Sequence, residues 1–242
     1  FASGYNTKKS YFSPAMFKTE LLAFGSDSDS SRLEFAAERH GGIMNIHFPK
    51  TCSISNSAGN DINDNDNDNR RISVILNGGL DNSEIQVKDG VTYLTGYSTA
   101  NSGGTDSNFK HYFVIGIFTG KNGDIPAIPL NGEDNTHADN NWIYNDFSSD
   151  ITDFTLRIGT SLISLSQAYD NCINEVGVKT GHTINTLYQD SKNEWNKQLS
   201  KIIINNIGNQ YDKKQQNDMF SCTHCGFITQ YQVELNVHMR MH

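Results

Sequence analysis

The hydrophobic and polar positions up to about residue 163 follow the short, alternating pattern of β-strands. The candidate strands are rich in Val, Ile, Tyr, Phe and Thr, and clusters of Gly, Asn, Asp or Ser bound them. A hairpin signal, Asp89-Gly90, separates two of them. Short strands without long helices between them predict an antiparallel β-sandwich rather than an α/β sheet. The strands are expected at residues 15–24, 32–38, 43–48, 71–76, 84–88, 91–96, 111–118 and 154–163.

Helical periodicity appears only after this region. Ser166 is predicted to cap a short helix that reaches Val176 and buries Cys172 as a small core hydrophobe. A second helix is expected from Thr183 to Leu199. Trp195 falls on its apolar face and is expected in the core, and a further strand is expected at residues 201–204. That apolar face is formed by Ile184, Leu187, Tyr188, Trp195 and Leu199.

Three regions follow from these patterns: a β-sandwich at 1–165, a helical linker at 166–218 and a separate C-terminal module at 219–242. Alternating Asn and Asp residues form a low-complexity insert at 56–69. A calcium loop would need a glycine at its sixth position and a bidentate Glu at its end, and neither falls in place. We expect a solvated loop, with loose cation binding as the alternative.

Composition narrows the function classes. The 242 residues carry a net charge of −8, which argues against a protein that coats nucleic acid. The chain contains no run of eighteen apolar residues, so we predict no membrane-spanning helix. The first residue is Phe1, so a removed signal peptide and the compartment both stay open. Trp142 is left with two interpretations, edge packing or a ligand platform.

Five stretches carry a resemblance to a known family through their order and spacing. They are Ser10–Ser13 followed by Phe17–Leu21, Glu38–Ile43 leading to Phe48-Pro49, Gly96–Ser98 followed by His111–Val114, Leu156–Ser161 followed by Ala168, and Trp195–Ile202. Together they resemble the N-terminal β-sandwich domain of glycoside hydrolase family 92, the calcium-dependent exo-acting α-mannosidases. The resemblance covers roughly residues 1–218.

The resemblance implies a sandwich that packs on a helical catalytic domain and acts on mannose-containing glycans. In that family the general acid, the water-activating carboxylates and the calcium ligands lie further along, and no residue here matches their positions. We therefore expect a catalytically incomplete segment, cut at both ends, with no catalytic residues and with calcium only in the missing domain. The visible acids are interpreted as solvated surface groups: Asp27, Asp29, Glu34, Glu38, Glu133, Asp134 and Asp139.

The C-terminal module has the ligand spacing of a C2H2 zinc finger. The spacing Cys222-x2-Cys225-x12-His238-x3-His242 lets two thiolates and two imidazoles meet one tetrahedral zinc ion. It predicts a ββα finger in which zinc substitutes for a hydrophobic core. His224 is a competing ligand that the x2 spacing disfavours.

The finger has little capacity to bind DNA, because Glu234 and Arg240 are its only charged side chains after Ser221. A protein partner is favoured over nucleic acid. The alternative function is thus a zinc-finger protein whose sandwich is an interaction module. The mannosidase interpretation implies a secreted or cell-surface protein, and the zinc-finger interpretation implies a nuclear one.

Overall fold

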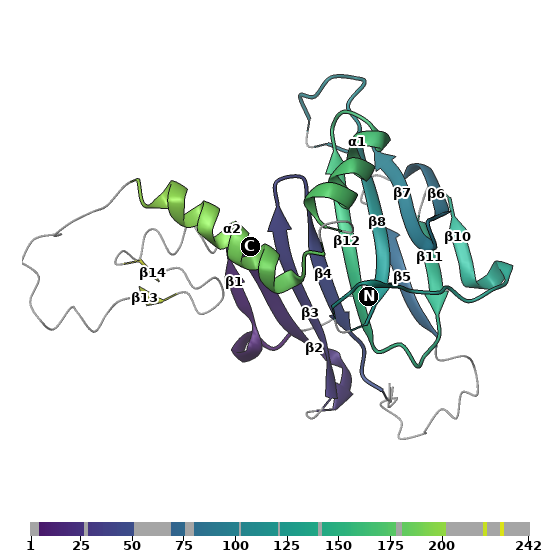
Figure 1. Ribbon diagram of the computed structural model, residues 1–242, viewed down its shortest axis with the longest axis horizontal. Helices are drawn as coiled ribbons and strands as arrows, with labels where there is room; N and C mark the ends of the chain where they lie inside the picture. The colour runs from purple at the N-terminus through teal and green to yellow at the C-terminus, as the bar shows by residue number, and fades with distance from the viewer. Residues whose placement is uncertain are drawn as a thin grey trace, which may run out of the picture.

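The described residues between 5 and 201 fold as two antiparallel sheets with helices on the outer face of the larger sheet (Figure 1). The larger, nine-stranded sheet has the order β1-β2-β3-β4-β12-β8-β7-β6, with β9 paired to β8, and the smaller has the order β10-β11-β5. The computed structural model describes residues 5–26, 29–50, 69–75, 80–101, 103–120, 122–139, 142–177 and 181–201, and two short strands near the C-terminus.

The strands of the large sheet are β1 (Tyr11–Ser13), β2 (Met16–Ser26), β3 (Asp29–Glu38), β4 (Gly41–His47), β6 (Asp81–Lys88), β7 (Val91–Ser98), β8 (His111–Thr119), β9 (Ile125–Pro126) and β12 (Asp153–Ser161). Those of the small sheet are β5 (Arg70–Ile75), β10 (Thr136–Ala138) and β11 (Trp142–Phe147). The mainly β, antiparallel class predicted from the alternation is confirmed, whereas β10 and β11 were not predicted.

The β6–β7 hairpin turns where the sequence signal placed it. Asp89 and Gly90 both have positive φ, 52° and 77°, as a two-residue hairpin turn requires. Lys88 pairs with Val91 directly across this turn. The turn therefore sets the register of the two strands.

An apolar core fills the space between the two sheets. The small sheet contributes Ile72, Ile143 and Phe147, and the large sheet contributes residues such as Ile117 and Phe154. All five follow β alternation: they are no more than 4% exposed, while their strand neighbours face outward or toward the helices. The architecture is therefore a sandwich with a helical third layer.

The helices are α1 (Leu165–Asp170), which continues into a π-helical turn η3 (Asn171–Glu175), and α2 (Ile184–Leu199); two 3-10 turns, η1 (Thr7–Lys9) and η2 (Glu133–Asn135), complete the described elements. Ser164, not the predicted Ser166, caps α1, because its side chain accepts a hydrogen bond from Gln167 N. Thr183 caps α2 in a capping box with Thr186.

Helix α1 and its π-helical turn lie unusually close to the sheet. Cys172 is fully buried there, as predicted, and packs with Tyr93 and Val114. A Cβ placed on Gly159 of β12 would lie 2.2 Å from the carbonyl oxygen of Ala168. The glycine thus permits the close approach of helix and strand backbones.

Helix α2 covers β2–β4 only with its first half. Ile184 and Leu187 are buried against Met16, Ala36 and Ile43. The prediction that Trp195 lies in the core is wrong: it is 45% exposed, and Leu199 is 58% exposed. The reason is visible in Figure 1, where the second half of α2 extends beyond the edge of the sheet.

Several predictions fall outside the described residues. They concern all but the last residue of the Asn/Asp insert predicted at 56–69, all but the first residue of the strand expected at 201–204, and nearly all of the C-terminal module. Within that module only β13 (Phe220–Ser221) and β14 (Ile228–Thr229) are described. They pair antiparallel, with Phe220 opposite Thr229.

Candidate functional site

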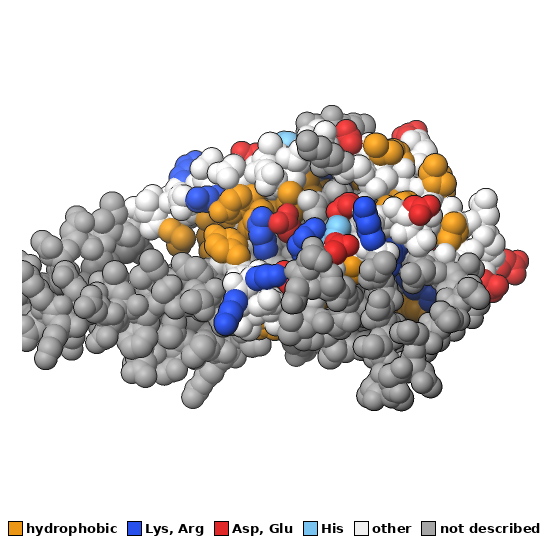
Figure 2. Space-filling view, turned by 90° about the horizontal axis from the view of Figure 1, so that it is seen from below, with side chains coloured by type: hydrophobic (Ala, Val, Ile, Leu, Met, Phe, Trp, Pro, Cys, Tyr) orange, Lys and Arg blue, Asp and Glu red, His pale blue; other side chains and the backbone are white. Residues whose placement is uncertain are grey.

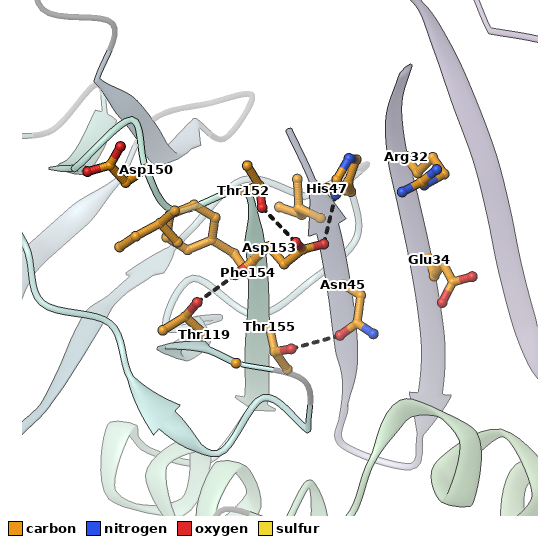
Figure 3. Close-up of a pocket in the computed structure, with 13 residues that line it drawn as sticks. Arg32, Glu34, Asn45, His47, Thr119, Asp150, Thr152, Asp153, Phe154 and Thr155 are labelled. Atoms are coloured by element: carbon orange, nitrogen blue, oxygen red, sulfur yellow. Dashed lines mark hydrogen bonds and ion pairs between the residues drawn. The ribbon is translucent and has the colours of Figure 1, made fainter. Parts of the chain in front are cut away.

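A groove of about 720 Å³ lies across β3, β4 and β12, on the face of the large sheet that carries the helices (Figure 3). Alternation places it there: Ile43 of β4 is buried under α2, and Asn45 and His47 follow on the same face beyond the helix. The lining residues are Arg32, Glu34, Asn45, Ile46, His47, Thr119, Gly120, Asp150, Ile151, Thr152, Asp153, Phe154 and Thr155.

At one end of the groove His47 is held between two carboxylates. Its Nε2 lies 2.9 Å from Asp29 Oδ1, and its Nδ1 lies 2.8 Å from Asp153 Oδ1. Asp29 also accepts a hydrogen bond from the backbone N–H of Lys50. The hydrogen bonds from His47 and Lys50 lower the pKa of Asp29. The imidazole is therefore fixed in orientation by two strands and a loop.

In the middle of the groove Thr155 donates a hydrogen bond to Asn45 Oδ1 at 2.9 Å. This contact leaves the amide nitrogen of Asn45 without a partner among the described residues, and Figure 3 shows it turned toward Glu34. The guanidinium of Arg32, which lies opposite His47 in the register, makes no side-chain hydrogen bond with another described residue, although its charge helps to lower the pKa of Asp29. The groove thus offers free donors beside fixed acceptors.

Charges of opposite sign alternate across the strands that flank the groove. Lys18 Nζ lies 2.7 Å from Glu34 Oε1, and Lys9 Nζ lies 2.9 Å from Glu20 Oε2. Glu20 is the cross-strand partner of Arg32. Figure 2 shows the result as a surface on which acidic, basic and histidine side chains intermix beside an apolar area. This face carries no field of one sign.

Two acids of this face, Asp29 and Glu20, have pKa values shifted in the direction opposite to that of a general acid. A glycosidase acid needs a raised pKa, usually from an apolar surrounding. Asp29 has a lowered pKa because of His47, and Glu20 has a lowered pKa because of its hydrogen bond with Lys9. Both carboxylates are therefore held in the ionised form.

A second polar cluster lies on the outer face of the small sheet. Arg71 makes a two-point contact with Asp146, 2.7 and 2.8 Å, and its guanidinium lies 3.8 Å from the ring centroid of Tyr144. Trp142 packs on Tyr144 at 4.6 Å and on His137 at 5.5 Å. These contacts favour the edge-packing interpretation of Trp142, because neighbouring rings and Arg71 occupy the faces a ligand would need.

The predicted zinc ligands Cys222, Cys225, His238 and His242 lie outside the described residues. Within the described part of the chain, no group of three or more His, Cys, Asp or Glu side chains could hold a metal ion. From the sequence, Asp29 was expected to be a solvated surface acid, and His47 was not singled out. Asp153 was not singled out at all, although its place at the start of a strand predicted from residue 154 was a usable signal.

No described helix combines the length and apolarity that crossing a bilayer demands.

The chain was compared with known proteins. No protein-family model matches it, and no curated protein sequence matches it. Solved structures do match: the family GH92 inverting mannosidase BT2199 from Bacteroides thetaiotaomicron is 19% identical, with a TM-score of 0.59, over 84% of this chain and 24% of its own. The family GH92 α-mannosidase BT3965 from the same bacterium is 16% identical, with a TM-score of 0.51, over 84% of this chain and 26% of its own.

These identities establish a shared fold. The sandwich with its covering helices has the architecture of a segment of GH92 mannosidases, so the fold implied by the sequence resemblance is confirmed. The chain spans about a quarter of the length of the mannosidases it matches.

Proposed function

We propose that residues 5–201 are the β-sandwich portion of an α-mannosidase-like glycoside hydrolase that acts on mannose-containing glycans. The observation that carries the proposal is the match of both sheets and the covering helices to GH92 mannosidases over 84% of the chain. The order of the sequence motifs adds support that is independent of the coordinates.

We propose further that the catalytic carboxylates, and any calcium, belong to a helical domain outside the described residues. An inverting glycosidase needs two carboxyl groups about 6.5–9.5 Å apart on either side of a sugar, one of them protonated. In the groove, Asp29 and Asp153 instead share one imidazole, 2.9 and 2.8 Å away. Their role on this view is structural or ligand-binding.

The test compares two proteins: this 242-residue chain, and the longest product of the transcript that encodes it. Both are incubated with an aryl α-mannoside and calcium. We expect no turnover by the chain and calcium-dependent release by the longer product. Turnover by the chain would contradict the absence of catalytic groups, and an inactive longer product without a helical domain would contradict the proposed function.

A second candidate is a zinc-binding interaction module at the C-terminus. Support comes from the ligand spacing of Cys222, Cys225, His238 and His242, and from the antiparallel pairing of β13 with β14 on either side of the two cysteines. A ββα finger begins with such a hairpin. The partner we propose is a protein, because the module has few basic side chains.

Cobalt titration tests this candidate, since Co²⁺ in a tetrahedral thiolate site absorbs visible light strongly. We expect the wild-type chain to show the visible absorption bands of tetrahedral Co²⁺. Cys222→Ser and His238→Ala should lose these bands, and the control Cys52→Ser should keep them. Identical spectra for all four proteins would reject the finger.

A further inference from the structure

We propose that the groove across β3, β4 and β12 is a binding site for a neutral oligosaccharide. The choice of mannosides as the expected ligand depends on the proposed function, whereas the location of the site depends only on the groove. Its volume of about 720 Å³ is within the range of sites that enclose small organic ligands.

The walls of the groove alternate donors with acceptors. The Arg32 guanidinium and the Asn45 amide nitrogen are donors without hydrogen-bond partners among the described residues. The Asp153 carboxylate, 63% exposed, keeps lone pairs beyond its bonds to His47 and Thr152. A sugar hydroxyl donates and accepts at once, so vicinal hydroxyls can satisfy donor and acceptor together. A ligand with only one of these capacities would leave half of the wall unpaired.

The charges disfavour the principal alternatives. An anion would face the carboxylates of Glu34, Asp150 and Asp153, against the single guanidinium of Arg32 in the lining. A cation would meet that guanidinium, and no group of three or more His, Cys, Asp or Glu side chains among the described residues could hold a metal ion. Neutral, hydrogen-bonding ligands therefore fit the lining best.

Apart from Arg32, whose side chain has no hydrogen-bond partner among the described residues, the binding groups are held in place before a ligand arrives. His47 is fixed by Asp29 and Asp153, and the Asn45 amide is oriented by Thr155. His47, Asn45 and the side chains that hold them come from the paired strands β3, β4 and β12, so little side-chain entropy is lost on binding. No exposed aromatic ring lines the groove, since Phe154 is 1% exposed. We therefore expect weak affinity, in the millimolar range.

Saturation-transfer NMR on the full 242-residue chain tests the site, with methyl α-mannopyranoside and an α-linked mannobiose as probes. We expect signal transfer to both sugars, with apparent affinity at least about fivefold weaker in Arg32→Ala and in Asn45→Ala. The matched control is Arg39→Ala, an exposed arginine in the turn after β3 that should bind like the wild type. Thermal unfolding of every variant verifies that it is folded.

Two results would overturn the inference: no transfer to either sugar, or equal transfer in the wild type and both groove variants. The inference would also be overturned if inorganic phosphate displaced the mannoside probe and a second neutral sugar did not. These results leave the proposed function intact, because calcium-dependent hydrolysis by the longer product decides that function separately. Conversely, sugar binding in the groove together with an inactive longer product would support the site and contradict the proposed enzyme function.

Discussion

The buried guanidinium of Arg157 donates from Nη1 to the carbonyl oxygen of Val176 at 2.8 Å, which joins the central strand β12 to the end of the π-helical turn. Its Nη2 donates to the carbonyl oxygen of Gly123 in the turn before β9, at 3.1 Å. One side chain therefore holds a helix end and a hairpin turn against the same sheet. Burial lowers the pKa of Arg157.

Replacing Arg157 with Met is predicted to destabilise the fold by about 1–3 kcal/mol, because two buried carbonyl oxygens lose their donors. Urea unfolding monitored by tryptophan fluorescence measures the change. The exposed Arg39→Met serves as the control and should shift the free energy of unfolding by less than about 0.5 kcal/mol. Equal effects at both positions would contradict the clamp.

Cys172 is predicted to resist alkylation in the native protein at pH 8. It is fully buried, its thiol donates to the carbonyl oxygen of Arg157, and burial raises its pKa to about 11. Little thiolate is present below that pH, and the reagent has no access. Mass spectrometry of the peptide that contains Cys172 should show labelling only after denaturation; fast native labelling would refute the burial.

The Asp29–His47 contact predicts how stability depends on pH. Because the pKa of Asp29 is lower in the folded state, its contribution is complete above the unfolded value of about 3.9 and is lost as the pH falls through the folded pKa. Asp29→Asn should therefore be less stable than the wild type at pH 6, and the difference should shrink between about pH 4 and pH 2. Chemical denaturation of both proteins at several pH values measures how each free energy of unfolding changes with pH. A difference between them that stays constant would contradict the stabilising role of the Asp29 carboxylate.

Gly159→Ala is predicted to destabilise the fold by about 3 kcal/mol or more, because the new methyl group would meet backbone atoms rather than mobile side chains. Its Cβ would lie 2.2 Å from Ala168 O and 2.4 Å from Cys172 N. Gly104→Ala is the comparison, since its Cβ meets nothing within 4 Å and only its positive φ of 78° opposes the change. We expect about 1 kcal/mol there, and a similar loss at the two sites would contradict the close approach.

The two halves of α2 predict opposite outcomes for truncation. Leu187 is fully buried, so Leu187→Ala should cost about 2–5 kcal/mol. Trp195 is 45% exposed, so Trp195→Ala should change stability by less than about 0.5 kcal/mol. Thermal and urea unfolding of both variants measures the contrast. A large loss at Trp195 would mean that the apolar periodicity of the helix, and not its position over the sheet, predicts burial.

The sequence predicts most strands of the large sheet because they alternate or carry β-branched residues between turn signals. It fails for β10 and β11, where Asn and Asp residues surround Trp142 and resemble a loop. Assignment of β5 and β11 to a separate sheet depends on pairing between residues some seventy positions apart, as for Arg71 and Asp146, and no local pattern encodes it.

The groove was missed for a related reason. Asp29, His47 and Asp153 come from three segments, and they meet only because β12 pairs with β4 and β4 pairs with β3. Spacing along the chain reveals ligand sets that are local, as in Cys222-x2-Cys225, but it does not reveal sets assembled by strand order. Trp195 illustrates the same limit, because periodicity marks a face and not whether anything lies opposite it.

The position of β12 has a consequence for biosynthesis. This strand pairs with both β4 and β8, so the four-stranded portion β1–β4, formed by the first fifty residues, keeps an open, hydrogen-bonding edge until residue 161 has left the ribosome. More than a hundred residues must be synthesised after β4 before β12 can join it to β8. This delay favours slow folding and contact with chaperones. Translation pauses beyond this strand would help the sheet to close.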